Sequence, residues 1–423
     1  RIFRLCWDTV TQNPRKFIFM SATNPLWASA VLLTERMVQP MDKPTVQDIF
    51  HRFYPAYLDQ YSPSPVQAKV AHNIMNCKTG AYGANVCVCE DCGFVQIHYN
   101  SCRNRCCPMC QAVPKEMWMD ARREDVLDAP YFHLVFTVPD ILNPVIYSNQ
   151  RLLYDALYHA ASSTISELTA DPKHLGAKVG YICILHTWGS EMNFHPHIHA
   201  ILLGGGLASN NQWKDNGENF FLPIRVISKV FRGKYLEELK RLWEEDKLVF
   251  HGTAEKFRNH YTFKELLDSC YGMDWIPHCK KTFNGAQTVI KYLGKYTHRI
   301  AVSNHRTVRM DDDTVTFLVK DYRNEGQWKE LTISGVEFVR RFLMHVPPRR
   351  FVRIRHYGLL CSRTKSQKLT LCRNLLGCKK YLSKLRDLEM PEILEHLYGI
   401  KVCVCKACGG HLGKPQMRMP LRC

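Results

Sequence analysis

Alternating histidines in residues 194–203 (FHPHIHAILL) constrain the fold of this chain more than any other feature. His195, His197 and His199 are spaced two apart, so in a β-strand their side chains share one face. Apolar residues at 198, 200 and 202 follow the strand pattern, and three glycines at 204–206 are expected to end it. Because neutral imidazole is the commonest metal ligand among side chains, the pattern predicts half of a metal site. The alternative is the polar face of a solvated strand.

A second pattern places two tyrosines in residues 286–299 (AQTVIKYLGKYTHR). Tyr292 and Tyr296 are four apart and share one face of a predicted helix, with Arg299 on the same face. Lys291 and Lys295 precede the two rings. Core packing is the ordinary use of such a pair, but a buried helix would not carry so many cations. A phenol can attack phosphorus when a cation lowers its pKa and a metal neutralises the phosphate, so strand and helix together predict phosphodiester cleavage.

The 19 cysteines concentrate in residues 77–110 and 361–423. Cys89-x-x-Cys92 and Cys107-x-x-Cys110 have spacings that predict structural zinc, with burial as small hydrophobic residues as the alternative. A short Cys-x-x-Cys-Gly-Gly sequence at 405–410 looks like half of another knuckle. Tight cysteine pairs favour zinc over disulfides and indicate a reducing cytoplasm. The spare candidates for a second site are Cys77, Cys87, His98, Cys102 and Cys106.

A formal net charge of +18 predicts an anionic partner, most simply nucleic acid. Arginines cluster in residues 340–355 beside aromatic residues, a combination that suits single-stranded DNA, although a solvated basic face fits that cluster equally well. No apolar run is long enough to cross a bilayer, and we expect neither a signal peptide nor an anchor. The predicted DNA contacts are Lys291, Lys295, Arg299, Arg353 and Arg355.

The order of elements predicts an α+β fold with a mostly antiparallel sheet flanked by helices and preceded by a small zinc-binding domain. Strands are expected at 131–138, 179–187, 194–203 and within 306–322, and helices at 46–57, 65–75, 115–127, 149–168, 235–243, 263–267, 285–298, 336–345 and 379–397. The expected organisation is a leader of doubtful function (1–40), a helical preface with the zinc-binding domain (41–112), a catalytic domain (113–305) and a basic, cysteine-containing carboxy-terminal region (306–423).

These motifs together resemble the His-hydrophobic-His (HUH) nucleases, specifically the two-tyrosine rolling-circle transposases of the IS91 type. The resemblance covers about residues 45–410. It is carried by YNSCRNRCCPMCQ (99–111), FHLVFTVP (132–139), LHTWG (185–189), HPHIH (195–199), YLGKYTHR (292–299), VKDYR (319–323) and RIRHYG (353–358). Cys106 departs from the family pattern, which usually has histidine there.

The resemblance implies that His197 and His199 are the HUH pair, that Tyr292 and Tyr296 are the nucleophiles, and that Mg²⁺ or Mn²⁺ is required. It implies a transposase that nicks and rejoins single-stranded DNA at insertion-sequence ends through a 5′-phosphotyrosine link, in a bacterial cytoplasm at the nucleoid. A third ligand is needed. A hairpin turning near residues 189–192 would bring His186 opposite the pair, which makes it the preferred third ligand. His195 and Gln287 are the alternatives.

Two other functions account for part of the sequence. A histidine-triad-like nucleotide hydrolase would use a histidine as nucleophile and need no metal, but it would leave the zinc module, the tyrosines and the positive charge unexplained. A non-catalytic zinc-dependent DNA-binding protein would use its histidines structurally. Sensitivity to chelators separates the first from the transposase, and a covalent protein–DNA adduct excludes the second.

Overall fold

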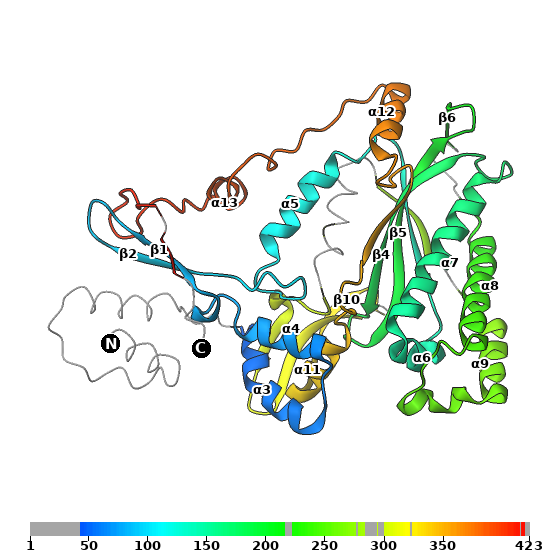
Figure 1. Cartoon of the computed structure of the whole chain (residues 1–423), viewed down its shortest axis with the longest axis horizontal. Helices are drawn as coiled ribbons and strands as arrows, with labels where there is room; N and C mark the ends of the chain where they lie inside the picture. The colour runs from blue at the N-terminus through cyan, green and yellow to red at the C-terminus, as the bar shows by residue number, and fades with distance from the viewer. Residues whose placement is uncertain are drawn as a thin grey trace.

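The computed structural model describes residues 43–215, 222–275, 278–283, 294, 300–321, 324–414 and 416–418. In these residues the strands form three antiparallel sheets with helices packed around them (Figure 1). The α+β class predicted from the sequence is therefore confirmed. None of the helices described is both long and apolar enough to cross a bilayer.

The largest sheet has the histidine strand at its centre. Its strands follow the order β11-β4-β5-β3-β7, each antiparallel to its neighbour, and β6 pairs with the end of β5. These strands are β3 (Tyr131–Thr137), β4 (Lys178–Trp188), β5 (Phe194–Leu207), β6 (Trp213–Asp215), β7 (His278–Phe283) and β11 (Ile354–Gly358). The central position buries both faces of β5, which explains its long apolar run.

The three glycines do not end β5, contrary to the prediction from the sequence. The strand continues through them to Leu207. A Cβ at Gly206 would overlap the backbone carbonyl of Lys178, and one at Gly205 would overlap the ring of Trp213. The glycines therefore allow close approach of the neighbouring chain, which is the other common reason for glycine inside a strand.

One face of this sheet is covered by four helices. They are α6 (Asn143–Ser148), α7 (Gln150–Ala170), α8 (Ile224–Glu244) and α9 (His260–Gly272). Alternate residues of the strands, such as Leu134, Phe136, Ile198 and Ala200, are buried against these helices in the main core. Figure 1 shows α7 and α8 side by side along the sheet. Because side chains alternate along a strand, the histidines of β5 point to the opposite face.

The amino-terminal helices pack on a second sheet from much later in the chain. The elements are α3 (Val46–Gln60), α4 (Pro65–Met75), β8 (Thr307–Met310), β9 (Thr314–Asp321), β10 (Gln327–Ser334) and α11 (Gly335–Met344). Phe50 and Phe53 of α3 share one core with Phe317 of β9 and Phe342 of α11. Contacts in this core therefore join residues assigned above to the helical preface (41–112) and to the carboxy-terminal region (306–423).

A third sheet joins a hairpin from the amino-terminal part of the chain to the last described residues. Strands β1 (Ala84–Val88) and β2 (Val95–Tyr99) form a hairpin, and β12 (Gln416–Arg418) pairs with β1. The helix α5 (Ala112–Arg123) leads from this region to the large sheet. Figure 1 shows the carboxy-terminal chain, coloured orange to red, returning past α5 to the β1–β2 hairpin.

The predicted helix over 379–397 is wrong in its first half. The chain instead forms α12 (Lys365–Leu376) and α13 (Met390–Tyr398) with an irregular segment between them. Gly377 adopts a left-handed conformation that ends α12, and Pro391 lies in the first turn of α13 after the cap at Glu389. The predicted helix over 285–298 lies outside the described residues.

Candidate functional site

Three histidines from adjacent strands converge on the open face of the large sheet. His186 of β4 is directly opposite His197 of β5, and Ile184 is opposite His199. The hairpin turn lies at residues 189–193, where Gly189 N–H donates to the carbonyl of Asn193. One ring nitrogen from each of the three histidines lies within 4.8 Å of the others. The pairing across the hairpin thus matches the geometry expected from the sequence.

The ring orientations leave acceptor nitrogens facing one another. The Nε2 atoms of His197 and His199 lie 3.0 Å apart, and Nδ1–H of His197 donates to the carbonyl of His195 over 2.7 Å. That bond fixes the tautomer of His197 so that its Nε2 keeps a lone pair. All three rings are buried, at 4–9 % exposure. Three converging imidazoles are a donor set that fits a divalent metal ion.

Burial also keeps the pair uncharged. Desolvation lowers the pKa of His197 to about 4, with a further contribution from neighbouring His195. Desolvation likewise holds the pKa of His199 well below its ordinary value. At neutral pH both rings are therefore neutral, which is the protonation state that a metal ligand requires.

His195, the alternative third ligand, has its ring beside that of His197 but does not belong to the group of converging nitrogens. Its Nδ1 is 3.2 Å from a carboxylate oxygen of Asp140, and its side chain is one-third exposed. Gln287, the other alternative, lies outside the described residues. Among the residues that the structure describes, the geometry therefore favours His186 as the partner of the pair.

His133 also contacts the histidine group, and the motifs did not single it out. Its Nε2 lies 2.8 Å from Nδ1 of His199, and the two rings stack. When Nε2 of His199 keeps its lone pair, Nδ1–H of His199 donates to His133. The signal was present in the sequence, because His133 belongs to the FHLVFTVP motif and alternates with apolar residues in a strand adjacent to β5.

An aromatic wall adjoins the histidine group. The ring of Trp188 stacks on His186 with centroids 4.5 Å apart, and His345 contacts Trp188 edge-on. His345 is held by two hydrogen bonds, because its Nε2–H donates to the carbonyl of Met192 and its Nδ1 accepts from the hydroxyl of Thr187. The end of α11 is thereby fixed to the β4–β5 turn.

The predicted nucleophiles Tyr292 and Tyr296 lie outside the described residues, together with Lys291, Lys295 and Arg299. Gly294, between the two tyrosines in the sequence, is described and buried. A Cβ at this position would overlap the Met119 side chain of α5. The chain at Gly294 therefore runs directly against α5.

The four cysteines predicted to bind zinc together are divided between two groups, which corrects the prediction. Cys107 and Cys110 meet Cys77 and Cys102, while Cys89 and Cys92 meet Cys405 and Cys408. The reason is the β1–β2 hairpin, which carries the first pair away from the second and beside the carboxy-terminal chain. In the first group, thiol donation from Cys102 and Cys107 lowers the pKa of Cys77 to about 7.

The predicted DNA contacts Arg353 and Arg355 have intramolecular partners. Arg353 is 8 % exposed, and its burial lowers the pKa of its guanidinium. Arg355 forms an ion pair with Asp155 and lies 3.9 Å from the centroid of the Tyr158 ring. Arg353 is thus buried just before β11, and Arg355 links β11 to α7.

Other exposed cations surround a cavity of about 350 Å³ between α4, the first cysteine group and the chain after α11. They are Lys69, Arg105, Arg349 and Arg350. No ion pair involving these four side chains occurs among the residues described. His345 and Arg349 lie only a few residues apart in sequence, so the same segment borders the aromatic wall and this basic cavity.

Two family models match the chain. Residues 180–368 match the model described as "Putative transposase", and residues 49–138 match the "Transposase zinc-binding domain". The first match contains His186, His197 and His199, and the second contains the first cysteine group.

Two curated relatives extend over most of the chain. It is 40 % identical over 369 residues to "Putative transposase y4qJ" of Sinorhizobium fredii, covering 86 % of this chain and 93 % of the relative. It is 30 % identical over 309 residues to the transposase for insertion sequence element IS801 of Pseudomonas savastanoi pv. phaseolicola, covering 72 % of each. A solved structure of the conjugative relaxase TrwC with oriT DNA, metal-bound, has 15 % identity and a TM-score of 0.23 over 43 % of this chain and 66 % of that chain.

The domain models and the relatives agree with each other and with the motifs read from the sequence. The chain therefore belongs to the family of insertion-sequence transposases of the IS91 and IS801 type.

Proposed function

We propose that this transposase nicks and rejoins single-stranded DNA at insertion-sequence ends through a 5′-phosphotyrosine intermediate. The observation that carries the proposal is the group of His186, His197 and His199, which are buried, adjacent and able to present neutral nitrogens. Within a transposase, such a group suits a divalent cation beside the scissile phosphate. We propose Mg²⁺ or Mn²⁺, of which Mn²⁺ accepts imidazole ligands more readily.

When bound, the ion would supply charge neutralisation at the phosphate. The chain's own residues orient the site. His195 fixes the tautomer of His197 through its carbonyl, and His133 fixes the ring of His199. Burial against Trp188 limits access of water to His186. These contacts hold the three rings in place before DNA arrives, so little reorganisation is needed during reaction.

The proposed nucleophiles are Tyr292 and Tyr296. The phenolate oxygen would form a bond to phosphorus while the bond to the 3′ oxygen breaks, and that oxygen leaves as a 3′-hydroxyl after taking a proton. The link conserves the phosphodiester energy, so a free 3′-hydroxyl can reverse the step and join a new strand without ATP. Two tyrosines would permit two successive transfers. The proposed setting is the bacterial cytoplasm, at the nucleoid.

The proposed path of the DNA includes the basic cavity beside α4. Its four exposed cations have no carboxylate partner in the described part of the chain, so they remain able to neutralise phosphates. In the first cysteine group, we propose that Cys77, Cys102, Cys107 and Cys110 hold a structural zinc ion. That ion would fix the loop bearing Arg105 at the edge of the cavity.

The test is a denaturing gel of the 423-residue chain with a 3′-labelled single-stranded element end, with Mn²⁺ or with chelator, because the strand joined to tyrosine keeps its 3′ end. The wild-type protein should form a covalent adduct only with the ion. Replacing Tyr292 and Tyr296 with Phe should abolish the adduct and leave DNA binding unchanged. An adduct from the double Phe protein would overturn the assignment of the nucleophiles.

A companion variant tests the histidine group. His197→Ala removes one proposed ligand, and we expect cleavage to fall about a hundredfold or more. Single-strand affinity should stay within a few-fold, because the basic cavity is unaltered. His195→Ala is the matched control and should have the smaller effect. Normal cleavage by the His197 variant would contradict a metal role for the group.

A further inference from the structure

The second cysteine group joins residues from opposite ends of the sequence. Sulfur atoms of Cys89, Cys92, Cys405 and Cys408 all lie within 4.8 Å of one another. The Sγ distances are 3.5 Å from Cys89 to Cys408 and 3.7 Å from Cys92 to Cys405. Four sulfurs this close, contributed as two Cys-x-x-Cys pairs, form the donor set of a tetrahedral zinc site.

Both pairs adopt the same turn. Gly93 N–H donates to the carbonyl of Cys89, and Gly409 N–H donates to the carbonyl of Cys405, each over 3.0 Å. Gly93 and Gly409 have positive φ angles of 70° and 77°, which favour glycine. This turn brings the second cysteine of each pair back beside the first. The two pairs are therefore matching halves of one site.

Backbone amides point at the sulfurs of the second pair. Ala407 N–H donates to Sγ of Cys405, and Gly410 N–H donates to Sγ of Cys408, both over 3.4 Å. Such N–H groups stabilise a thiolate, the form that binds a metal. Bridges between Cys89 and Leu412 and between Val404 and His411 complete the surrounding framework.

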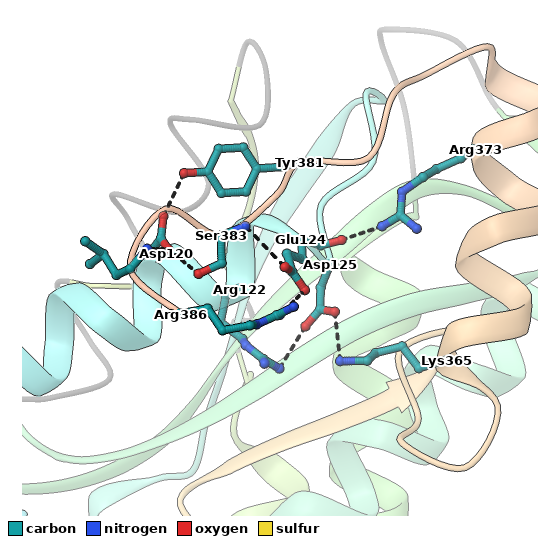
Figure 2. A network of polar contacts seen from close by, with 10 residues as sticks. Asp120, Arg122, Glu124, Asp125, Lys365, Arg373, Tyr381, Ser383 and Arg386 are labelled. Atoms are coloured by element: carbon teal, nitrogen blue, oxygen red, sulfur yellow. Dashed lines mark hydrogen bonds and ion pairs between the residues drawn. The ribbon is translucent and has the colours of Figure 1, made fainter. Parts of the chain in front are cut away.

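The chain that supplies the second pair is anchored to α5 on its way from the large sheet. Figure 2 shows this network. Asp120 accepts from the hydroxyls of Tyr381 and Ser383 at 2.7 and 2.5 Å and from the N–H of Leu385 at 3.0 Å. Arg386 forms an ion pair with Glu124. Residues 377–414, the carboxy-terminal segment, thus lie along α5 and end at the β1–β2 hairpin (Figure 1).

We propose that Cys89, Cys92, Cys405 and Cys408 bind a second structural zinc ion, which fastens the carboxy-terminal segment to the amino-terminal zinc-binding domain. Cys405 and Cys408 lie beyond the residues that either family model matches. The ion closes a loop of more than three hundred residues. The ion and the Asp120 network together hold the segment at two points, one at the β1–β2 hairpin and one on α5, the helix against which Gly294 packs.

Counting zinc in the reduced 423-residue chain by native mass spectrometry tests the site. Cys405→Ser and Cys408→Ser should each bind one ion fewer than wild type, and Cys89→Ser should lose the same ion. Cys403→Ser and Cys361→Ser replace exposed cysteines outside both groups and should bind as many ions as wild type. The test compares the zinc count of each variant with that of wild type. A difference of one ion is therefore informative whether or not the first cysteine group also binds zinc.

An unaltered count in the Cys405 and Cys408 variants would overturn the proposal, as would loss of the ion in the Cys403 variant. A second measurement avoids variants altogether. In the zinc-loaded protein, exposed Cys92 and Cys408 should react with iodoacetamide at least tenfold more slowly than exposed Cys361, and chelator should remove the difference. Equal alkylation rates before chelation would also overturn the proposal. So would a disulfide among these four cysteines in protein purified without reductant, which is detected as the loss of the mass of two hydrogen atoms.

Discussion

The ring of His199 contacts those of three other histidines, His133, His186 and His197. Positive charge on all four rings would repel strongly in this buried site. Desolvation and the neighbouring rings both depress the pKa of His199. The same burial that removes charge leaves nitrogen lone pairs available, so the local electrostatics favour cation binding.

His133 should act as a positioning residue for His199. His133→Ala removes the partner of the His199 Nδ1, so we expect Mn²⁺ affinity to fall about tenfold to a hundredfold. Isothermal titration of Mn²⁺ measures the change, and single-strand affinity should remain within a few-fold. His133→Gln, which keeps an acceptor, should recover part of the loss. His159→Ala, on the exposed face of α7, is the control. Unchanged Mn²⁺ affinity in His133→Ala would contradict the role.

His345 should make stability depend on pH. Burial lowers its pKa to about 4, below the 6.5 of an unfolded histidine. Between these values the unfolded chain binds more protons than the folded chain, so stability is present above pH 6.5 and is lost as the pH falls toward 4. The His345→Gln variant lacks this titrating group. Its free energy of unfolding should therefore change less steeply with pH, by up to ~1.4 kcal/mol per pH unit. Chemical denaturation at pH 4.5 to 6.5 measures it, and an unchanged slope would contradict the assignment.

At the scale of elements, α5 connects parts of the molecule that are distant in sequence. It begins just after Cys110 of the first cysteine group, contacts Gly294 through Met119, and holds the carboxy-terminal segment through Asp120 and Glu124. Asp120 is buried, and the hydrogen bonds from the segment outweigh the burial that would raise its pKa, so that the pKa is lowered. A carboxylate with several donors in a buried position is costly to remove.

Asp120→Ala should release the carboxy-terminal segment from α5. Loss of the buried acceptor leaves the hydroxyls of Tyr381 and Ser383 without their partner, at a cost of about 1–3 kcal/mol. Hydrogen exchange of residues 378–388 should become faster by roughly tenfold to a hundredfold, while that of β4 and β5 stays unchanged. Asp128→Ala, an exposed carboxylate just beyond α5, is the control. Equal exchange in the two variants would show that the network does not hold the segment.

Over the described part of the molecule, some cations form ion pairs with carboxylates and others do not. Arg241 and Arg309, for example, are engaged by carboxylates, whereas the cations around the cavity beside α4 are exposed without such partners in the described chain. Among the residues described, several cations of this kind gather where the first cysteine group meets the segment that follows α11.

Replacing Lys69, Arg349 and Arg350 with Ala should weaken binding of single-stranded DNA and reduce its salt dependence. If each cation neutralises one phosphate, the slope of log affinity against log salt should decrease by about 2. Fluorescence anisotropy over a salt series measures this slope. Replacing Lys229, Lys240 and Lys264, exposed on the helical layer of α8 and α9, removes the same charge and should change the slope much less. Similar slopes in both triple variants would show that the cations of the cavity do not bind DNA preferentially.

Local sequence determined much of the central sheet. Alternation gave His197 and His199 a common face, and the short turn after β4 placed His186 opposite them, because antiparallel pairing across a short turn leaves few registers. The motif containing His133 was visible too. Its contact with His199 was not, since it depends on which strand lies on the other side of β5.

The sequence by itself determined the α+β class, the histidine hairpin, the amphipathic helices α3, α4 and α11, and the transposase family. Periodicity and short spacings are local properties, and they suffice for these features. Only the tertiary structure decided how the cysteines group, because Cys405 and Cys408 are more than three hundred residues from their partners and the spacing of a motif carries no information across such a distance. It also decided that Arg353 is buried and that Arg355 contacts Asp155 and the ring of Tyr158, since charge alone does not show whether a cation faces solvent or the protein.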